Sequence, residues 1–438
     1  MTSVKGLVAL GLAASALVLG ACGSGGDQST TAGGASSSTA AAKSAGEDLS
    51  GSLRVGWIAE VRAGMEPIAA AFKEKYPNVD LKVEYTPLPQ FIQTLSTQIR
   101  GGNAPDVIYT GSGSSIPIGP VPLGNAGRLA ALSGLPGAAD LPKPIRVNVS
   151  ASDGKVVALS PSLNVDGLIY NSDMLQQTGI EPPKTFDELL AACKKLSDAG
   201  TTPIAFSSDP PLLQSVLSQL GAAFVTSQDP DWATKRAAGD TTFASSPEWQ
   251  RAVHAFEQMR DAKCFSQGAR GTTSAQVINQ LANGQAAMFI NGTSYIGAVA
   301  GLNPETGAKL RLTPMPNDAG DGKVTLVAAS AMGVNADADN ADAAKKFVEF
   351  AVSPDVAAES AKVQGGVTLK QMADGDVPAS MSDIKADLQD GNYFPTTSTG
   401  WPPTVSTQAA TQLIGLFTGQ ANAKDVLAAA DKAWDSNS

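Results

Sequence analysis

The sequence predicts an α/β protein built on a mostly parallel sheet, because short apolar runs alternate with stretches of helical periodicity. Residues 52–58 and 79–85 are typical of strands, and the second run alternates apolar and polar positions. Between them, Pro67 opens a helix whose apolar residues recur at helical spacing. A second helix covers 91–99, and a short strand follows at 106–109. The order is β-α-β-α-β, which implies parallel strands with helices on both faces of the sheet.

The length predicts two domains, and the later part of the chain continues with further strands and helices. The chain has 438 residues, which exceeds what one hydrophobic core usually holds. A helix from Thr185 carries Glu188 three residues later, which is the pattern of a capping box. Further strands are expected at 167–170, 203–206, 286–290 and 324–334, and further helices from Ser246, from Asn340 and near the end of the chain.

The charge and the rare residue types exclude several partners and cofactors. The sequence has 31 Lys and Arg against 41 Asp and Glu, so its formal net charge is −10. Binding to nucleic acid needs clustered basic residues, and we therefore expect no nucleic-acid partner. Three cysteines and one histidine leave few ligands for a transition metal. We expect neither a metal site nor a cofactor.

The first 49 residues are expected to lie outside the fold. Residues 1–21 combine one basic residue, an apolar run and small residues at the end, which is the pattern of a secretory signal peptide. A retained transmembrane anchor is the alternative, but the run is short for one. Leu19–Cys22 resembles a bacterial lipobox, in which the cysteine thiol receives a diacylglyceryl group, the chain is cleaved before it, and the new N-terminus is acylated, for example with palmitate. Residues 22–49 predict a flexible tether, so the mature protein would be lipid-anchored on the extracytoplasmic face of the cell membrane.

Four segments in a fixed order resemble the extracellular solute-binding proteins of ABC importers, within the carbohydrate-binding branch that is similar to maltose-binding protein. They are FKEKYPNVDLKVEY, GNAPDVIYT, DGLIYNSDMLQQTGIEPPKTFDELLAACKKLSDAGTTPIAF and GQAAMFINGTSY. The third is the most specific, because it holds a Tyr-Asn pair, a Pro-Pro-Lys-Thr helix start and a helix that ends at glycine. The resemblance extends from about Leu53 to Trp434 and follows the lipobox and the tether.

The resemblance implies a two-lobed periplasmic-binding-protein-like fold, in which two α/β lobes joined by three hinge crossings close on a ligand in the cleft between them. The N-terminal lobe would comprise residues 50–160 and 323–366, and the C-terminal lobe 161–322 and 367–438. Glycines at the crossings suit segments whose backbone must rotate, although ordinary turns would also account for them. The crossings are expected near Ser160–Asn164, Asp318–Lys323 and Gly365–Gly366.

The resemblance also implies a function. The protein would capture a carbohydrate, either a mono- or an oligosaccharide, and deliver it as a monomer to the membrane subunits of an ABC permease. One alternative is the same class of receptor for a non-sugar solute. The other alternative is a secreted carbohydrate-active enzyme.

Several observations argue against an enzyme. The sequence has no Gly-x-Ser-x-Gly nucleophile elbow and no phosphate-binding loop. The single histidine, His254, is expected to lie partly exposed on a helix. A glycosidase could use two carboxylates alone, but no pair stands out by motif.

A sugar site needs aromatic faces for the rings and planar polar groups for the hydroxyls. Trp57 follows the first strand, and Glu60 and Arg62 lie in the loop after it. The carboxyl ends of parallel strands are where α/β folds bind ligands, so all three are candidates. Trp57 could instead belong to the core, and the two charged residues could simply be solvated.

Further candidates lie in later segments. Ser112 and Ser114 follow the third strand, at a place where maltose-binding protein carries an aromatic residue and charged groups. This departure argues against maltodextrin-type recognition, and the loop could also be only a compact turn. Trp401 stands between turn residues and is the aromatic candidate that we favour; its replacement by alanine is expected to weaken binding without unfolding the chain. The positions that resemble ligand positions of the family are Asn164, Asp166, Asp209, Asn291 and Tyr295.

Some of these positions have alternative interpretations. Asp166 could face solvent or brace the hinge, and Asp209 could cap the helix that follows it. Tyr295 stands one place beyond the tryptophan that the family often has. The remaining tryptophans after Trp57 are expected to be structural: Trp232, Trp249 and Trp434.

Cys193 and Cys264 remain once Cys22 is assigned to lipidation. In an exported protein, an even pair of cysteines favours a disulfide. Two buried free thiols are the alternative.

Overall fold

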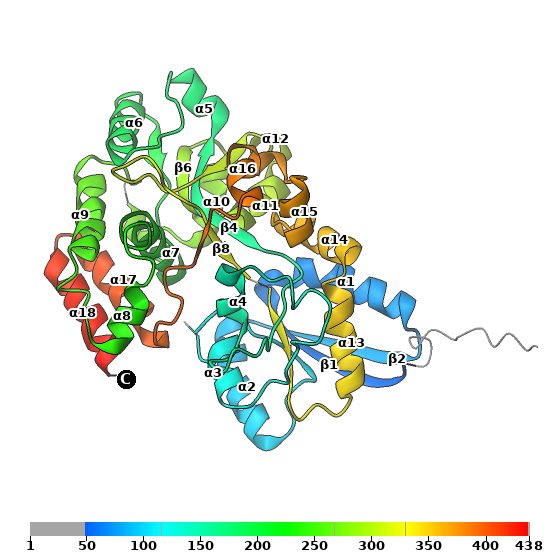
Figure 1. Ribbon diagram of the computed structural model, residues 1–438. Coiled ribbons are helices and arrows are strands. Elements are labelled where there is room, and N and C mark those ends of the chain that lie inside the picture. The colour runs from blue at the N-terminus through cyan, green and yellow to red at the C-terminus, as the bar shows by residue number, and fades with distance from the viewer. Residues whose placement is uncertain (1–48, 115, 267, 329, 437–438) are drawn as a thin grey trace, which may run out of the picture. The chain divides into compact units, whose positions relative to one another are not determined.

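The computed structural model describes residues 49–114, 116–266, 268–328 and 330–436 (Figure 1). The expected signal peptide, the lipidation site Cys22 and nearly all of the expected tether lie outside the described residues. Within those ranges, no helix has both the length and the apolar character needed to cross a bilayer. The fold contains two sheets, each with its own cover of helices, as the sequence predicts.

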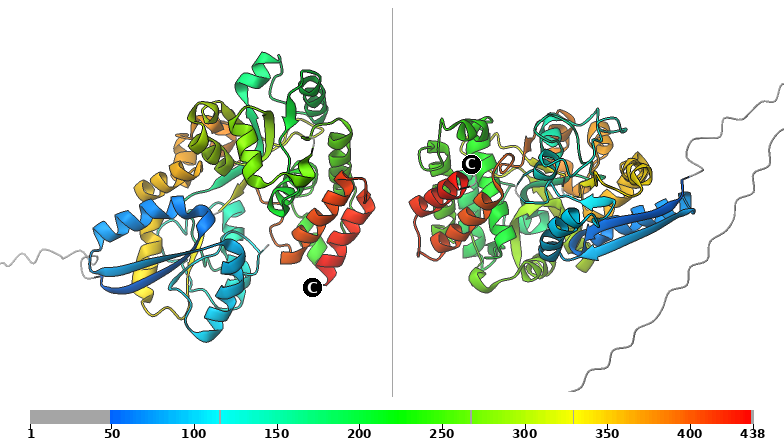
Figure 2. Two further views of the ribbon diagram at one scale, coloured as in Figure 1. Left: turned by 180° about the vertical axis from the view of Figure 1, so that it is seen from behind. Right: turned by 90° about the horizontal axis from the view of Figure 1, so that it is seen from below.

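The first sheet confirms the predicted β-α-β-α-β order. Its strand order is β2-β1-β3-β9, in which β1 is parallel to β2 and β3, and β9 is antiparallel to β3. Figure 2 shows the long strands β1 and β2 side by side in blue. The bounds are β1 (Gly51–Ile58), β2 (Val79–Thr86), β3 (Val107–Tyr109) and β9 (Met332–Val334).

The helices of the first sheet bury an apolar stripe against it. The helix expected from Pro67 begins earlier, at Arg62, and its Phe72 is fully buried against Phe347 and Phe350 of a later helix. These contacts tie the start of the chain to a segment almost three hundred residues later. The bounds are α1 (Arg62–Lys75), α2 (Leu88–Gly101), α3 (Pro120–Asn125), α4 (Lys143–Val149), α13 (Ala341–Ala351) and α14 (Pro354–Gln364).

The second sheet is mixed and is organised around β4. Its order is β10-β8-β4-β6-β5, and β7 also pairs with β4. Strand β4 is antiparallel to β6, β7 and β8, whereas β5 is parallel to β6 and β10 is parallel to β8. The bounds are β4 (Asn164–Asn171), β5 (Thr202–Ile204), β6 (Ala286–Gly292), β7 (Leu310–Thr313), β8 (Thr325–Val327) and β10 (Phe394–Pro395).

The predicted capping box is present at the start of α6, one of the helices that cover the second sheet. The side chains of Thr185 and Glu188 each accept a hydrogen bond from the other's backbone N–H group. The longer helices pack in pairs, with α17 beside α18 and α7 beside α17. The bounds are α5 (Ser172–Gln177), α6 (Phe186–Asp198), α7 (Pro210–Gly221), α8 (Trp232–Ala238), α9 (Pro247–Asp261), α10 (Ser274–Ala282), α11 (Thr293–Leu302), α12 (Pro304–Gly307), α15 (Leu369–Asp374), α16 (Lys385–Gln389), α17 (Pro403–Phe417) and α18 (Ala423–Asp435).

One cluster of aromatic rings fills the space between α8, α9 and α18. Trp249 and Trp434 each lie within 6.4 Å of Trp232, measured between ring centroids. All three side chains are buried, as expected for structural tryptophans. Phe243 and Trp401 complete the cluster, and we call these five residues the aromatic cluster.

Three passages of the chain connect the two sheets. Gln364, at the start of the third passage, forms side-chain hydrogen bonds with the other two. Leu163 and Val367 exchange two backbone hydrogen bonds where the first and third passages run side by side. Gln364 accepts a hydrogen bond from Ser330 at 2.6 Å and donates one to Ser162 at 3.3 Å. The three passages are therefore cross-linked by polar contacts.

The second passage lies after the predicted crossing at 318–323. Strand β8 still pairs with β4 and β10 in the second sheet, and the chain joins the first sheet at β9. The change of sheet therefore occurs between Val327 and Met332. The exact lobe boundaries stay a prediction.

Cys193 of α6 and Cys264 after α9 are joined by a disulfide and fully buried. The bond closes a loop across 71 residues, and chain entropy predicts that its loss costs about 2–4 kcal/mol of stability. We expect denatured protein that carries Cys22→Ser to show no thiols with Ellman's reagent before reduction and two afterwards. Two thiols before reduction would contradict the disulfide.

Candidate functional site

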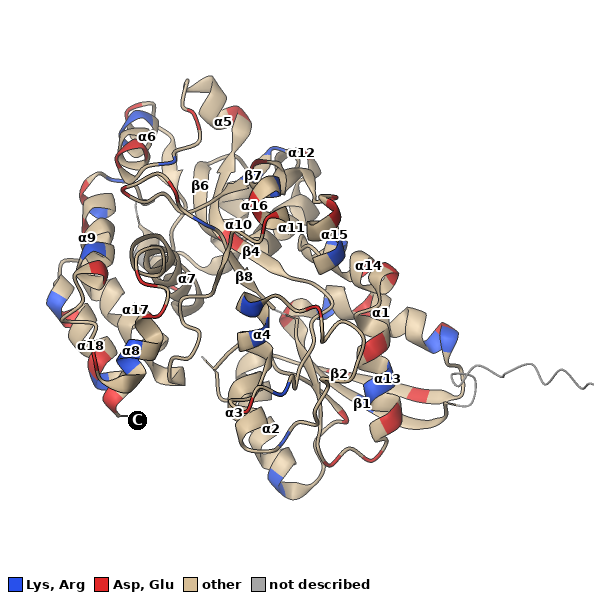
Figure 3. Cartoon of the chain, in the orientation of Figure 1, with Lys and Arg blue, Asp and Glu red and all other residues tan. Residues whose placement is uncertain are grey.

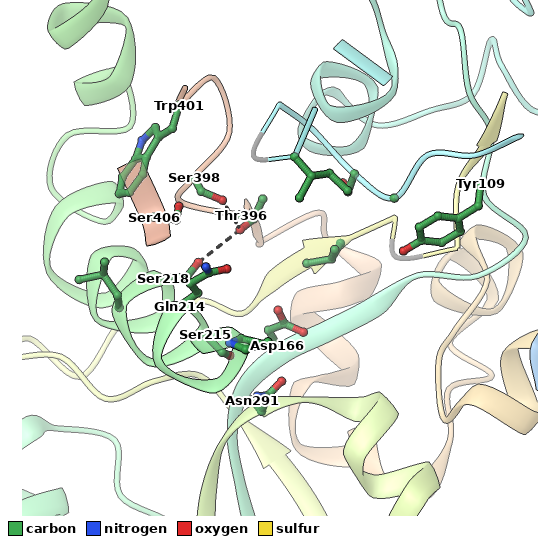
Figure 4. A pocket seen from close by; sticks show the side chains of 16 residues that line it. Tyr109, Asp166, Gln214, Ser215, Ser218, Asn291, Thr396, Ser398, Trp401 and Ser406 are labelled. Carbon is green, nitrogen blue, oxygen red and sulfur yellow. Dashed lines mark hydrogen bonds between the residues drawn. The ribbon is translucent and has the colours of Figure 1, made fainter. Parts of the chain in front are cut away.

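A cavity of about 300 Å³ lies between elements of the two sheets (Figure 4). One wall follows β3 of the first sheet, and the other walls come from β4, β6, α7 and the segment before α17. The described residues that line it, which we call the site cavity, are Tyr109, Gly111, Ser112, Ile116, Asp166, Pro211, Gln214, Ser215, Leu217, Ser218, Asn291, Val327, Thr396, Ser398, Trp401 and Ser406.

Helix α7 gives one polar face to the site cavity. Ser218 lies four residues after Gln214 and three after Ser215, so it shares a helix face with both. Thr397 donates a hydrogen bond to the carbonyl oxygen of Ser218 at 2.7 Å. Gly221 permits this close packing, because a Cβ there would stand 2.6 Å from the Thr397 side chain. The segment after β10 is thereby held against α7.

The base of the site cavity is built by neighbouring strands. Asp166 of β4 and Asn291 of β6 stand on neighbouring antiparallel strands, and both side chains line the site cavity (Figure 4). The Asn164 amide donates a hydrogen bond to Asp166 Oδ1 at 2.6 Å. Burial raises the pKa of Asp166 to about 7, because the ionised carboxylate loses solvation in this wall. The group is therefore near half-protonated at neutral pH.

The opposite wall is formed at the end of β3. Tyr109 is buried and turns its hydroxyl toward the site cavity (Figure 4). The Trp57 ring packs edge-on against it, with 5.1 Å between ring centroids. Burial, with a smaller contribution from Glu60, raises the pKa of Tyr109, so its hydroxyl stays protonated at neutral pH. Ser112 Oγ, which also lines the wall, is buried and has no hydrogen-bond partner among the described residues.

Two hydrogen bonds connect the walls directly. Ser114 donates from Oγ to the carbonyl oxygen of Trp401 at 2.8 Å. Thr399 donates from Oγ1 to Asn148 Oδ1 at 2.9 Å, which links the same segment to α4. The segment between β10 and α17 therefore contacts both halves of the structure beside the site cavity.

The structure brings four of the predicted residues to the lining of the site cavity. They are Ser112, Asp166, Asn291 and Trp401. Trp401 differs from the expectation in one respect, because only 2% of its surface is exposed and it belongs to the aromatic cluster. It is thus a core residue with an edge on the site cavity.

Three predicted residues near the first strand do not line the site cavity. Trp57 is 1% exposed and lies behind Tyr109. Glu60 accepts the backbone N–H of Leu88, so its carboxylate caps the start of α2. Arg62 is exposed and pairs with Glu66 on its own helix, over the ring of Tyr85. Trp57 thus matches its core alternative and Arg62 its solvated one, whereas the capping contact of Glu60 was not among the stated alternatives.

Four other predicted residues lie beside the site cavity and position its walls. Asn164 accepts hydrogen bonds from Thr293 and from the N–H of Ser294, so it fixes the start of α11. Ser114 forms the link to Trp401 described above. The remaining two are Asp209, which accepts two hydrogen bonds from Ser274, and Tyr295, which packs against Phe289.

Several residues that line the site cavity were not predicted from the sequence. Gln214, Ser215 and Ser218 are polar positions on a helix, and such positions usually face solvent. Thr396 and Ser398 lie in the same short segment as Trp401, TTSTGWPP, whose many hydroxyl side chains could have indicated a polar lining. Tyr109 ends the strand at 106–109 and could have been included by the rule that placed Trp57.

A second and larger cavity, of about 620 Å³, holds none of the predicted site residues. Its walls come from α13 to α16 and from the loop before α4, and most of them are aliphatic. Among the described residues, no group of three or more acidic, histidine or cysteine side chains is arranged to hold a metal ion. The polar cavity next to β4 is therefore the candidate site.

Comparisons with known proteins identify the family of this chain. The sequence matches the family of bacterial extracellular solute-binding proteins over residues 56–358. A melibiose/raffinose/stachyose-binding protein of Bacillus subtilis (strain 168), MelE, is 24% identical over 341 residues, which is 75% of this chain and 73% of that protein.

Solved structures share the fold. A sugar transporter protein of Bacillus licheniformis in complex with stachyose has a TM-score of 0.69 at 17% identity, and the match covers 88% of this chain and 100% of that one. The solute-binding protein RafE in complex with raffinose has a TM-score of 0.70 at 18% identity, over 88% and 99% of the two chains. At these identities the likeness establishes the two-lobed fold.

Proposed function

The chain belongs to the family of bacterial extracellular solute-binding proteins, and from this premise we propose that it captures a carbohydrate in the site cavity and delivers it to an ABC permease. The first candidates are neutral oligosaccharides of the melibiose, raffinose and stachyose series, because MelE is named for them. The structures with bound stachyose and raffinose have the same fold.

The lining of the site cavity is the observation that carries this proposal. Hydroxyl and amide side chains from α7 and from the segment before α17 surround one carboxyl group, and two aromatic residues, Tyr109 and Trp401, stand at the edges. Such groups can pair with sugar hydroxyls and cover the C–H faces of a ring. The buried Ser112 Oγ without a partner supports a polar ligand, because buried polar atoms normally have one.

The mechanism follows from the position of the site cavity between two sheet-centred halves. A ligand that contacts both halves stabilises the closed arrangement by the difference between its affinities for the closed and the open forms. The permease would then recognise the closed form. Catalysis is not part of the proposal, because glycoside hydrolysis generally uses two carboxyl groups and the described lining of the site cavity has one.

A thermal-shift screen tests the proposed function. The panel includes raffinose, stachyose, melibiose, maltotriose and chitobiose, together with amino acids and short peptides as non-sugar controls. At millimolar concentration we expect at least one neutral oligosaccharide to raise the unfolding midpoint by several degrees, because a ligand that binds only the native state stabilises it. Stabilisation by a non-sugar solute alone would contradict sugar binding.

We also propose that Cys22 carries the lipid anchor. The lipobox Leu19–Cys22 and the composition of 22–49 support this, and both lie outside the described residues. In a bacterial host with lipoprotein processing, we expect the wild-type protein in the membrane fraction and Cys22→Ser in the soluble fraction. Equal partitioning of the two forms would contradict anchoring at Cys22, and mass spectrometry of the N-terminal peptide would identify the acyl chains.

A further inference from the structure

Asp166 is the one acidic side chain among the described residues that line the site cavity, and none of those residues is basic. The others bear hydroxyl, amide, aromatic or aliphatic groups, or are glycine and proline. Tyr109 is neutral because burial raises its pKa. Among the described residues, acidic and basic side chains are spread over helices, strands and loops, with both signs interspersed (Figure 3). The described lining of the site cavity thus presents one carboxyl group and no cation.

The groups around Asp166 on its own sheet are polar or acidic. On β4, the Asn164 amide donates to its Oδ1 at 2.6 Å. On β6, the neighbour is Asn291. On α11, Tyr295 has its pKa raised to about 12, first by burial and then by the negative charges of Asp209 and Asp166. None of these groups supplies a positive charge.

The other described elements that line the site cavity also place no basic side chain in it. Helix α7 presents Gln214 and Ser215, and β8 places Thr325 opposite Asp166 in register. Across the site cavity stand Tyr109 and the wall after β3. None of the ion pairs among the described residues includes Asp166.

An uncompensated carboxylate in a small cavity discriminates ligands by charge. A neutral sugar can donate hydroxyl hydrogen bonds to it, and bonds to an ionised acceptor are stronger than those between neutral groups. A protonated amine on the ligand would supply the missing positive charge. A carboxylate or phosphate on the ligand would place a second negative charge in the same cavity, and like charges at close range repel strongly where solvent is excluded.

We propose that Asp166 sets the charge specificity of the site cavity: glycosides with a protonated amine bind most tightly, neutral glycosides bind next, and acidic glycosides are excluded. This inference rests on the proposed function, because it takes carbohydrate binding as given and names the class of carbohydrate.

A pH dependence follows from the same geometry. The pKa of Asp166 is raised to about 7 by burial, so the ionised acceptor is lost as the pH falls below neutrality. If only the ionised form accepts the sugar hydroxyls, the affinity for a neutral glycoside is expected to fall by about 30-fold between about pH 8.5 and pH 5.5. An acidic glycoside should show the opposite trend, because protonation of Asp166 removes the repulsion.

Three matched sugars test the proposal by isothermal titration calorimetry on the whole mature chain. They are raffinose, the derivative in which the galactose C6 is oxidised to a carboxylate, and the derivative in which C6 carries a primary amine. At about pH 7.5 we expect the amine to bind at least about 10-fold more tightly than raffinose and the carboxylate at least about 10-fold more weakly. In Asp166→Asn we expect the three affinities to lie within about threefold of one another, because the amide has the same shape and no charge.

The outcomes distinguish failure of the charge proposal from failure of the proposed sugar-binding function. A carboxylate derivative that binds as tightly as raffinose, or an order of affinities that persists in Asp166→Asn, would overturn the charge proposal and leave sugar binding intact. Absence of binding by all three sugars at any pH from about 5.5 to 8.5 would overturn the proposed function for this series, and the charge proposal with it. Should Asp166→Asn not fold, the opposite pH trends of raffinose and its carboxylate in the wild type provide the same test.

Discussion

Replacing Asp166 by asparagine is expected to raise the free energy of unfolding at pH 8 and to leave it nearly unchanged near pH 4. The folded-state pKa of this group is about 7, whereas the ordinary value is 3.8. The folded chain therefore binds more protons than the unfolded chain between these values, and its stability falls as the pH rises through that window. The full shift corresponds to about 4 kcal/mol, and partial exposure reduces the expected gain in Asp166→Asn to roughly 1–3 kcal/mol.

Chemical denaturation at several pH values from about 4 to 8 measures this effect. Asp240→Asn is the matched control, because Asp240 is exposed and lies outside the site cavity. We expect the control to follow the wild type at every pH. A gain for Asp166→Asn that is the same at pH 4 and pH 8 would show that burial of its charge is not the cause.

Replacing Trp401 by alanine is expected to lower the free energy of unfolding by about 3–5 kcal/mol, which is typical of large-to-small changes at buried aromatic positions. The ring is almost fully buried, and it contacts Phe243 and Trp249 at centroid distances of 5.1 and 5.5 Å. This corrects the expectation from sequence, in which the same change weakened binding without unfolding. A cavity in the aromatic cluster would affect the whole second half.

Urea denaturation followed by circular dichroism tests this prediction. Trp401→Phe keeps an aromatic ring in the cluster and is expected to cost less than half as much as alanine. An unfolding free energy of Trp401→Ala within about 1 kcal/mol of the wild type would contradict a structural role. Sugar affinity is informative only for the phenylalanine variant, because it retains the fold.

The fold could be predicted from the sequence largely because its signals are local. The alternation of strand and helix up to Tyr109 and the capping box of Thr185 and Glu188 are set by residues close together in the chain. The position of the second passage could not be predicted in this way, because it depends on the pairing of β8 with β4, a strand more than 150 residues earlier. The start of α1 was placed too late, because Pro67 is a usual first residue of a helix and here lies inside one.

The site was predicted only in part, for the same reason. Asp166 and Asn291 were found because they end up on neighbouring strands at the positions that the family resemblance indicated. The polar face of α7 was missed, since Gln214 and Ser218 look like solvent-facing residues until α7 is placed against the segment after β10. Glu60 looked like a ligand, but its carboxylate caps the start of α2. A polar residue type alone does not distinguish a cap from a ligand contact.

Asp166 connects stability with function. Its burial costs folding free energy at neutral pH, and no cation in the described surroundings offsets that cost. A hydroxyl-rich or amine-bearing ligand would offset it, so ligand binding and the stability of the closed form are coupled through one carboxyl group.

The central claim is that a neutral oligosaccharide binds in the site cavity. The most direct test is calorimetric titration of the oligosaccharide that gives the largest shift in the thermal screen, with the wild type and with Gln214→Ala. Gln214 lines the site cavity from α7, and Gln93→Ala on the exposed side of α2 is the matched control. We predict one site per chain, at least about a 10-fold loss of affinity in Gln214→Ala, consistent with loss of a buried hydrogen bond, and no loss in Gln93→Ala. Equal affinities of the wild type and Gln214→Ala would place the sugar elsewhere and contradict the claim.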